Sequence, residues 1–564
     1  MRTRKSVAIL ALFGLAACGG AGAPADAVDS AAAGGPDSIT EQEISEHLAI
    51  LASDEFGGRA PNSPGEILAT DYITAQFERA GLEAGNGDSF FQNVPLVDIT
   101  AAPAASLVVA GGGDPLSFNY GDDFVTWTTR VVEASSVAGT EMVFVGYGIV
   151  APEYGWDDYA AVDVAGKTVV VLVNDPGFAT QDPDLFTGNA MTYYGRWTYK
   201  FEEAARQGAA AALIVHQTAP AAYGWDTVRN SWTGPQFNLQ SPDGNADRVA
   251  IEGWISEATT LALFERAGLD FAALSADAVT GDFAALSMGI SLTADVANTL
   301  RFSDSRNVVG ILRGAAAPDE YFVYMAHWDH FGTDAEIAAT GADGIYNGAL
   351  DNASGTAALL ELADAFASLP ERPRRSIVFL AVTAEEQGLL GSAHYAANPI
   401  FPLAQTVAGL NMDGLSNFGP TRELVVSGHG LSALDGILET AAAAVGRRID
   451  PGPEPEKGYY YRSDHFELAK QGVPMIYPAA GIDHLEHGAE WGQAQNDKYL
   501  VERYHMVTDE FDESWDLSGV VPDVQLYYAV GAQVANSPDW PNWNEGTEFR
   551  ALRDASRAAA GGQE

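Results

Sequence analysis

Apolar positions with helical spacing open the folded part of this chain, and strand-like apolar runs follow. From about 115 to 297 short apolar runs are broken by Gly, Pro and Asp, which predicts mostly strands. From residue 305 such runs alternate with helical patterns, for example over 355–368, which predicts an α/β arrangement. The first helical patterns are Ile44, Leu48 and Leu51, and then Leu68, Tyr72, Ile73 and Phe77, ending before Gly81.

These changes of pattern divide the chain into domains. At 564 residues it exceeds the usual size of a single core. The alternating part lacks an N-terminal helical layer of its own, so we assign 38–114 to it and predict one α/β domain made of 38–114 and 298–550. Its expected fold is a central, mostly parallel mixed sheet flanked by helices. Residues 115–297 are predicted to form a β-rich insert, and 551–564 a disordered tail.

The N-terminus has the features of an export signal. Basic residues within 2–5 precede an apolar run, 7–17, that is too short to span a bilayer as a mature helix. The segment Leu-Ala-Ala-Cys at 15–18 resembles the lipobox of bacterial lipoproteins. We therefore expect 1–18 to be a signal peptide ending at Cys18, 19–37 to be a flexible tether, and the protein to be exported and lipid-anchored at the cell envelope.

Composition narrows the chemistry. Cys18 is the only cysteine, so a disulfide, a thiolate metal site and a thiol nucleophile in the mature protein are excluded. The net charge of −46, with no basic stripe in the sequence, argues against nucleic acid as a partner. The only membrane contact that we expect is the lipid anchor.

Acidic and histidine side chains follow several of the predicted strands. Glu385 and Glu386 come directly after the apolar run 376–382, where unpaired carboxylates would be costly to bury. The C-terminal edge of an open α/β sheet is where ligands bind. His and carboxylate groups without thiolates suit zinc, with cobalt or manganese as alternatives. The other groups in such positions are His327-Trp-Asp329-His330, Asp351-Asn-Ala-Ser-Gly, Asn411-Met-Asp413 and Tyr504-His505.

In their order and residues these motifs resemble the M28 family of metallopeptidases, the di-zinc aminopeptidases, over most of 38–114 and 298–535. The insert more loosely resembles a protease-associated (PA) domain, at 143–149 and 166–172. Six motifs carry the M28 resemblance: Ala326–His330, Ile345–Gly355, Glu385–Ser392, Asn411–Asp413, Arg462-Ser-Asp464-His465 and Trp491-Gly…Arg503-Tyr504-His505…Asp509-Glu510.

The resemblance implies a metal site and a reaction. His327 and Asp413 are expected to bind one zinc, Glu386 and His505 a second, and Asp351 to bridge the two ions. Glu385 would act as general base toward a metal-bridging water that attacks a peptide bond. Asp329 is expected to accept the imidazole N–H of His327, and Tyr504 to stabilise the oxyanion. The predicted function is removal of N-terminal residues from peptides.

Alternatives remain open at this point. A carboxypeptidase would need a basic residue for the terminal carboxylate, for which Arg462 is the nearby candidate. Glutaminyl cyclases of the family use one zinc, and a noncatalytic surface lipoprotein would be expected to have lost ligands. The segment His484-Leu-Glu-His487 matches no zinc motif and is predicted to be a loop because Gly481 and Gly488 flank it.

Overall fold

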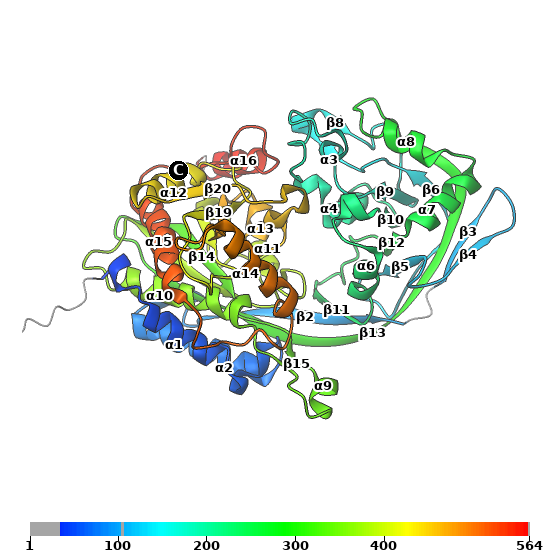
Figure 1. Cartoon of the computed structure of the whole chain (residues 1–564). Helices are drawn as coiled ribbons and strands as arrows, with labels where there is room; N and C mark the ends of the chain where they lie inside the picture. Colours follow the sequence, from blue (N-terminus) through cyan, green and yellow to red (C-terminus); the bar gives the residue numbers. More distant parts are fainter. Residues whose placement is uncertain (1–33, 103–105, 562–564) are drawn as a thin grey trace, which may run out of the picture.

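The computed structural model describes residues 34–102 and 106–561 (Figure 1). The predicted signal peptide with Cys18, and the predicted tether up to residue 33, lie outside this range. The described end of the tether is joined to the domain, since Gly35 donates its N–H to the carbonyl of Ala365 at 3.1 Å. No helix within 34–102 or 106–561 has the length and apolarity required to cross a membrane.

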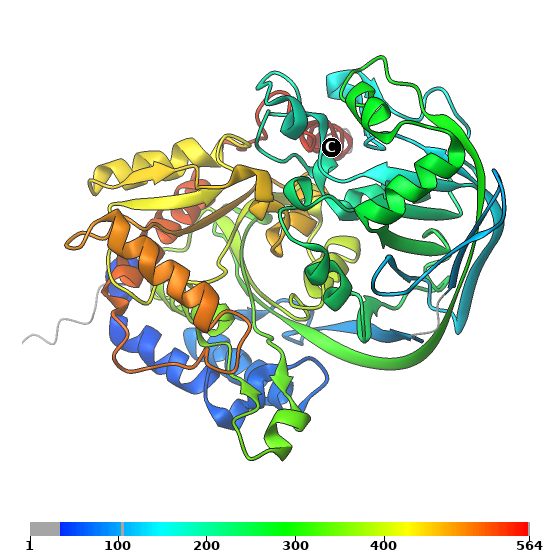
Figure 2. The same cartoon turned by 45° about the vertical axis from the view of Figure 1, so that its right-hand side comes forward.

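The chain forms two lobes that are joined by a long two-stranded ribbon (Figures 1 and 2). The strand β2 (Phe91–Ala101) pairs antiparallel with the 27-residue strand β13 (Leu286–Leu312). The N-terminal part of β13 lies in the sheet of the second lobe, and its C-terminal part lies in the sheet of the first. Between the lobes β11 (Pro235–Leu239) extends the ribbon by pairing with β2.

The sheet of the first lobe is mixed with a parallel centre. Its strands run in the order β11-β2-β13-β17-β14-β18-β21-β19-β20. The four central strands are mutually parallel, so their C-terminal ends meet at one edge. They are β14 (Ala317–His327), β17 (Arg375–Val382), β18 (Thr406–Asn411) and β21 (Met475–Ala480); beyond them lie β19 (Glu423–Ser427) and β20 (Arg448–Asp450).

Helices cover both faces of this sheet. Along β14, Phe322 and Tyr324 pack into one core while Val323 and Met325 pack into another, as the two-residue repeat of a doubly buried strand requires. The first face is covered by α1 (Glu41–Leu51), α2 (Pro64–Ala80), α10 (Ser354–Ala367), α12 (Leu434–Ala444) and α15 (Val520–Asn536). The second is covered by α11 (Leu390–Ala397) and α13 (His465–Ala469), and α16 (Arg550–Gly561) packs next to the start of β18.

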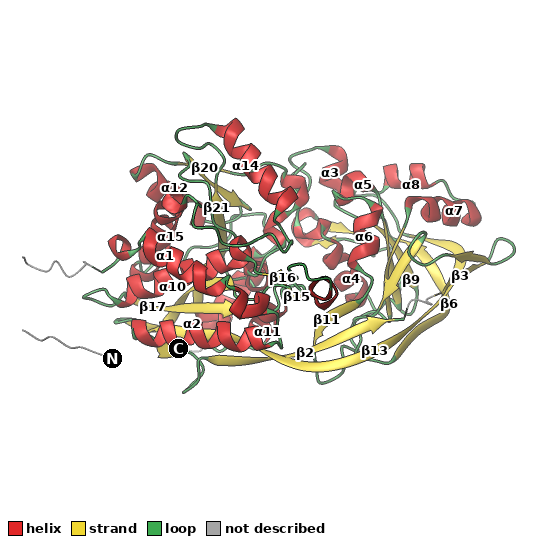
Figure 3. Cartoon of the chain, turned by 60° about the horizontal axis from the view of Figure 1, so that its bottom comes forward, coloured by secondary structure: helices red, strands yellow, loops and turns green. Residues whose placement is uncertain are grey.

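The second lobe has its own sheet, in the order β4-β3-β13-β6-β9-β10-β12-β5. One buried core consists entirely of residues from this lobe, among them Trp127, Val171 and Trp254. Figure 3 shows both its strands and its helices. Its strands are β3 (Ser106–Ala110), β4 (Leu116–Phe118), β5 (Phe124–Trp127), β6 (Ala134–Phe144), β9 (Thr168–Leu172), β10 (Ala211–Val215) and β12 (Ile251–Ile255); its larger helices are α4 (Trp197–Arg206), α6 (Trp225–Ser231) and α7 (Glu257–Ala267).

The predicted α/β fold with a central, mostly parallel mixed sheet is confirmed, and α1 and α2 lie where the apolar spacing placed them. Three details differ. The second sheet begins with β3 at Ser106, ahead of the predicted boundary at 115. The insert is more helical than predicted, since segments such as α7, capped by Ser256 and ended at Gly268, also fold as helices.

The third difference is the tail, where a disordered segment was predicted from 551 and the structure has α16. The helix is held by buried Arg553, whose guanidinium donates to the carbonyls of Thr406 and Val407. Arg557 lies 3.3 Å from the ring centroid of Trp540. Cation–π and backbone contacts of long side chains, rather than an apolar stripe, therefore dock this segment.

Candidate metal centre

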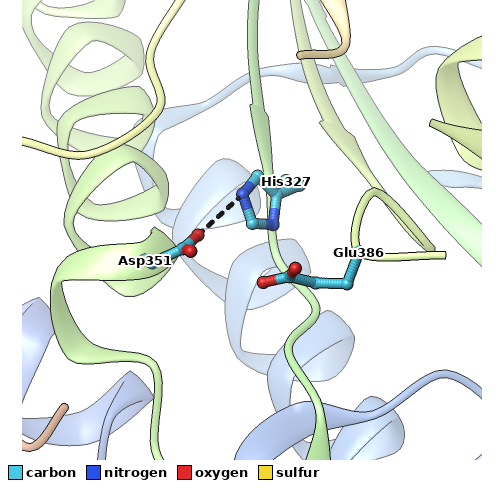
Figure 4. A group of neighbouring side chains, drawn as sticks. All are labelled: His327, Asp351 and Glu386. Carbon is cyan, nitrogen blue, oxygen red and sulfur yellow. Dashed lines mark ion pairs between the residues drawn. The ribbon is translucent and has the colours of Figure 1, made fainter. Parts of the chain in front are cut away.

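Five His and carboxylate residues converge at the C-terminal edge of the parallel strands. His327 is the last residue of β14, Glu386 follows β17, and Asp413 follows β18. Asp351 precedes α10, and His505 follows α14 (Ala489–Glu502). Figure 4 shows the side chains of His327, Asp351 and Glu386 pointing toward one another. These are the five residues predicted as metal ligands.

Asp351 belongs to two groups of side chains in close contact, one around His327 and one around His505. The Nε2 atom of His327 lies 3.2 Å from Oδ1 of Asp351 and 3.2 Å from Oδ1 of Asp413. The Nε2 atom of His505 lies 3.2 Å from Oδ2 of Asp351 and 3.4 Å from Oε2 of Glu386. One carboxylate thus faces a different histidine with each of its oxygens, which is the arrangement that a bridging ligand requires.

The donor set fits divalent cations. Candidate ligand atoms of His327, Asp351 and Glu386 lie within 4.8 Å of one another, and so do those of His327, Glu385 and Asp413. Burial, followed by the charges of Asp351 and Glu385, raises the pKa of Glu386 well above its usual value. Such a buried cluster of like charges needs cations to remain ionised, and imidazole with carboxylate ligands suits zinc.

Glu385 lies beside His327 and Asp413, with candidate ligand atoms of the three residues within 4.8 Å of one another. Its backbone N–H donates to Oδ1 of Asp329 at 3.2 Å, which fixes the loop that carries it. Burial, followed by the carboxylates of Asp413, Asp464 and Asp351, raises the pKa of Glu385 well above its usual value, although His327 acts in the opposite direction. A carboxylate in such surroundings has a high affinity for a proton.

Asp329 has a different contact from the predicted one. Its carbonyl oxygen, rather than its carboxylate, lies 3.1 Å from Nδ1 of His327, whereas the carboxylate Oδ1 lies 3.8 Å away. The backbone therefore holds the imidazole tautomer, and the Asp329 side chain holds the Glu385 loop. Burial raises the pKa of Asp329 to about 6.

Tyr504 lies at the rim of the centre. Its ring stacks on that of His505 with centroids 3.8 Å apart, and 42% of the residue is exposed. A second phenol, Tyr477, donates to the carbonyl of Asp413 at 3.4 Å. The phenol of Tyr504 is thus the more accessible of the two to a substrate.

Two positioning contacts were missed in the sequence. Nδ1 of the fully buried His330 lies 2.5 Å from Oε1 of Glu386, although no role was assigned to His330 from the sequence. Ser463 donates to Oδ2 of Asp413 at 2.6 Å, and Asn411 donates to Ser463 at 2.8 Å. Each of these contacts occupies one carboxylate oxygen, of Glu386 or of Asp413, and leaves the other oxygen available to bind a metal ion.

Two further residues hold the backbone that carries the ligands. Buried Arg59 donates to the carbonyls of Leu51, Trp328, Asn347 and Gly348, which ties the N-terminal segment to both ligand loops. The carboxylate of Asp509 accepts the N–H groups of Leu350 and Asp351 at 3.1 and 3.2 Å. Arg59 and Asp509 are not ligand candidates themselves, so the pattern of candidate ligands did not reveal them. The only sequence signal for either was the presence of Asp509 in the last family motif.

The His484–His487 segment is a loop, as predicted. Nδ1 of His484 accepts the N–H groups of Glu486 and His487, both at 3.1 Å. Neither histidine belongs to a metal-competent group among the residues that the structure describes.

The sequence of this chain is similar to those of known peptidases. Residues 307–529 match the model of peptidase family M28. The chain is 37% identical over 130 residues to mouse "Aminopeptidase NAALADL1", covering 22% of this chain and 16% of that protein. It is 42% identical over 116 residues to a "Probable zinc metalloprotease" of Pyricularia oryzae, covering 20% of each. A "Glutamate carboxypeptidase 2 homolog" of Caenorhabditis briggsae is 36% identical over 213 residues, covering 35% and 24%.

The chain therefore spans a quarter or less of the length of these curated relatives. Among solved structures, an aminopeptidase from Aneurinibacillus sp. strain AM-1 is 20% identical with a TM-score of 0.47, covering 90% of this chain and 96% of that one. A zinc aminopeptidase from Bacillus subtilis is 17% identical with a TM-score of 0.40, covering 90% and 98%. The segment that matches the M28 family model, residues 307–529, contains all five predicted ligands.

Proposed function

We propose that this protein is a di-zinc aminopeptidase that hydrolyses N-terminal residues from peptides. The observation that carries the proposal is the pair of contact groups that share Asp351, with Glu385 beside them. His327 and Asp413 would hold one ion, and Glu386 and His505 the other. When bound, such ions lower the pKa of water and polarise a substrate carbonyl.

Glu385 is the proposed general base. It is partly buried next to a ligand, and its raised pKa favours taking a proton from the attacking water and returning it to the leaving amine. Asp329 keeps the Glu385 backbone in place, and the exposed Tyr504 phenol can donate to the oxyanion of the tetrahedral intermediate.

Negative charge beside the centre supports recognition of a free amino terminus. Asp464, adjacent to the Asp413-binding Ser463, is buried; its Oδ1 accepts the hydroxyl of Ser392 at 2.6 Å, and its Oδ2 has no partner among the described residues. Burial raises the pKa of Asp464 to about 7, so a nearby ammonium group would favour its ionised form. This surplus of acid suits an α-ammonium better than a terminal carboxylate.

A carboxypeptidase is the second candidate, and two arginines favour it. The Nε atoms of Arg462, in the first lobe, and Arg196, in the second, are buried without a hydrogen-bond partner among the described residues. Neither guanidinium forms an ion pair with a carboxylate there. Burial, followed by the charge of Arg462, lowers the pKa of Arg196 to about 10. A substrate carboxylate between them would compensate both charges.

One experiment separates these functions. The zinc-loaded protein would be assayed with aminoacyl chromophores, with N-acylated peptides that have a free carboxylate, and with peptides that begin with glutamine, before and after dialysis against a chelator. An aminopeptidase cleaves only the first class and recovers on re-addition of zinc. Cleavage of the second class alone would identify a carboxypeptidase, and cyclisation of the third a cyclase. Zinc binding with no turnover at all would identify a noncatalytic binding protein.

Glu385→Gln is the matched variant. It should retain zinc and fold but lose at least roughly 10²–10⁴-fold in kcat, the range for a lost general base. Turnover close to that of the unchanged protein would assign the base to another residue.

A further inference from the structure

A cleft of about 500 Å³ lies beside α14 and contains the His484–His487 loop. Two of the lining segments, 417–420 and 484–487, come after the C-terminal ends of β18 and β21 in the chain. The cleft therefore lies at the same edge of the sheet as the metal centre. Backbone hydrogen bonds join the walls, from Gly419 to Asp516 and from Leu485 to Pro420, both at 2.9 Å. The cleft is therefore formed before any ligand arrives. In Figure 2, α14 is the orange helix of the first lobe.

Aromatic rings converge on Trp491 in this cleft. The ring centroids of His484 and His487 lie 4.8 and 4.6 Å from that of Trp491, and the Phe418 centroid lies at 6.0 Å. Because Nδ1 of His484 accepts two N–H groups, the neutral ring carries its proton on Nε2. This lining offers ring faces and no metal ligand set.

The charge of the cleft is negative. Glu486 and Asp516 line it, and no lining residue is a lysine or an arginine. Neither carboxylate forms an ion pair among the described residues, and the hydrogen bonds of Asp516 come from Ser518. Arg422, behind the loop, is paired with Asp483 at 2.7 Å. Ring faces flanked by unpaired carboxylates attract cations.

One face of α14 connects the cleft to the metal centre. Trp491, Gln495 and Tyr499 follow at four-residue spacing and share that face. The Tyr499 ring lies 6.1 Å from that of Tyr504, which stacks on His505. Eight helical residues rise about 12 Å, the length of about four residues of extended peptide.

We propose that this cleft is a subsite for a lysine or arginine side chain of the peptide substrate, about four residues from the bond that is cleaved. The proposal rests on the proposed peptidase function. Such a subsite would make the enzyme prefer basic peptides of five residues or more. Trp491, Glu486 and Asp516 would contact the basic side chain.

The substrate test uses hexapeptides with an N-terminal leucine and one lysine moved through positions 3 to 6, against norleucine as the uncharged match. Lysine at one distal position, expected near position 5, should lower KM by roughly 2- to 30-fold with kcat unchanged, the span of a cation–π contact. Added salt should reduce this preference. Equal KM values for lysine and norleucine at every position would overturn the proposal.

Two variants and a control assign the effect to the cleft. Glu486→Gln and Trp491→Leu should remove the lysine preference. Glu490→Gln, which neutralises an exposed acid on α14 outside the cleft, should keep it. Trp491→Leu removes a large, partly buried ring and can therefore destabilise the protein. Glu486 is exposed, so Glu486→Gln is the variant that should keep the fold. A preference retained in Glu486→Gln and Trp491→Leu alike would place the lysine site elsewhere and refute the assignment.

A binding measurement separates this proposal from the peptidase function. Calorimetry on the zinc-loaded protein would use an N-acetylated, C-amidated Ala-Ala-Lys-Ala peptide, which has no free terminus to cleave, and its norleucine counterpart. Selective binding of the lysine peptide, lost in Glu486→Gln, supports the subsite even if no peptide is hydrolysed. No selective binding while hydrolysis proceeds normally refutes the subsite alone.

Discussion

Replacement of His330 tests how the protein holds one of its proposed ligands. The side chain is fully buried, and its Nδ1 lies 2.5 Å from Oε1 of Glu386, while its Nε2 has no partner within the described residues. An unpaired buried acceptor is less costly than an unpaired N–H, so the proton belongs on Nδ1, which donates to the carboxylate. This bond directs the second oxygen of Glu386 toward His505, 3.4 Å away.

The expected loss of zinc affinity in His330→Ala follows from the contact between His330 and Glu386. His330→Ala leaves Oε1 of Glu386 buried without a donor and free to rotate away from the ion. Loss of such a supporting contact typically weakens metal affinity by about 10–100-fold, which equals roughly 1.4–2.8 kcal/mol. Only the ion that Glu386 and His505 are proposed to hold should be affected, because the contacts of Asp413 with His327 and Ser463 remain.

Competition with a zinc-binding chromophore measures both ions. His330→Asn can place its amide N–H near the position of Nδ1 and should recover most of the affinity, whereas His330→Gln, whose amide reaches toward the position of Nε2, should not. Equal zinc affinities of the alanine variant and the unchanged protein at both sites would refute the positioning role. Equal losses in the asparagine and glutamine variants would show general damage to the loop instead.

Other expectations can be checked separately. Tyr504→Phe should lower kcat and kcat/KM together with little change in KM, because an oxyanion contact acts in the transition state; a change in KM alone would contradict this. Glu252, buried in the second lobe, has its pKa raised by burial to about 7, so folded protein binds more protons than unfolded protein between about pH 4.5 and 7, and the stability of that lobe should fall as pH rises through this window. Thermal unfolding of Glu252→Gln should lack that slope, and an identical slope would refute the assignment. Arg59→Lys should lower the melting temperature and zinc affinity together, since lysine cannot reach four carbonyls; unchanged values in both measurements would oppose the role. Cys18→Ser should release the protein from the envelope with its activity intact, and continued membrane association would oppose the predicted lipid anchor.

Strand periodicity marks where each parallel strand ends and so brought the acidic and histidine groups together, whereas the choice of the ligands within these groups was implied by the resemblance to the M28 family. Once His327, Glu386 and Asp413 are assigned to neighbouring strand ends, topology brings them to one edge. The α/β fold follows from the same alternation of strands and helices. What holds the ligands is less visible, because Arg59 acts through backbone carbonyls that have no sequence pattern.

The details that escaped prediction depend on tertiary contacts. The helix from Arg550 has little apolar character, and its docking depends on Arg553 reaching the carbonyl groups of the strand β18. The lobe boundary is hidden because β13 continues without a turn from one sheet into the other. Likewise, nothing near Asp329 in the sequence distinguishes contact through its carbonyl from contact through its carboxylate.

Metal stoichiometry tests the proposed di-zinc centre most directly. Elemental analysis of zinc-saturated, gel-filtered protein should return two zinc ions per chain, and Asp351→Ala should lose tight binding of both, because Asp351 faces both His327 and His505. Circular dichroism would verify that the variant is folded. One zinc ion or fewer per chain in the saturated, unchanged protein would contradict the account.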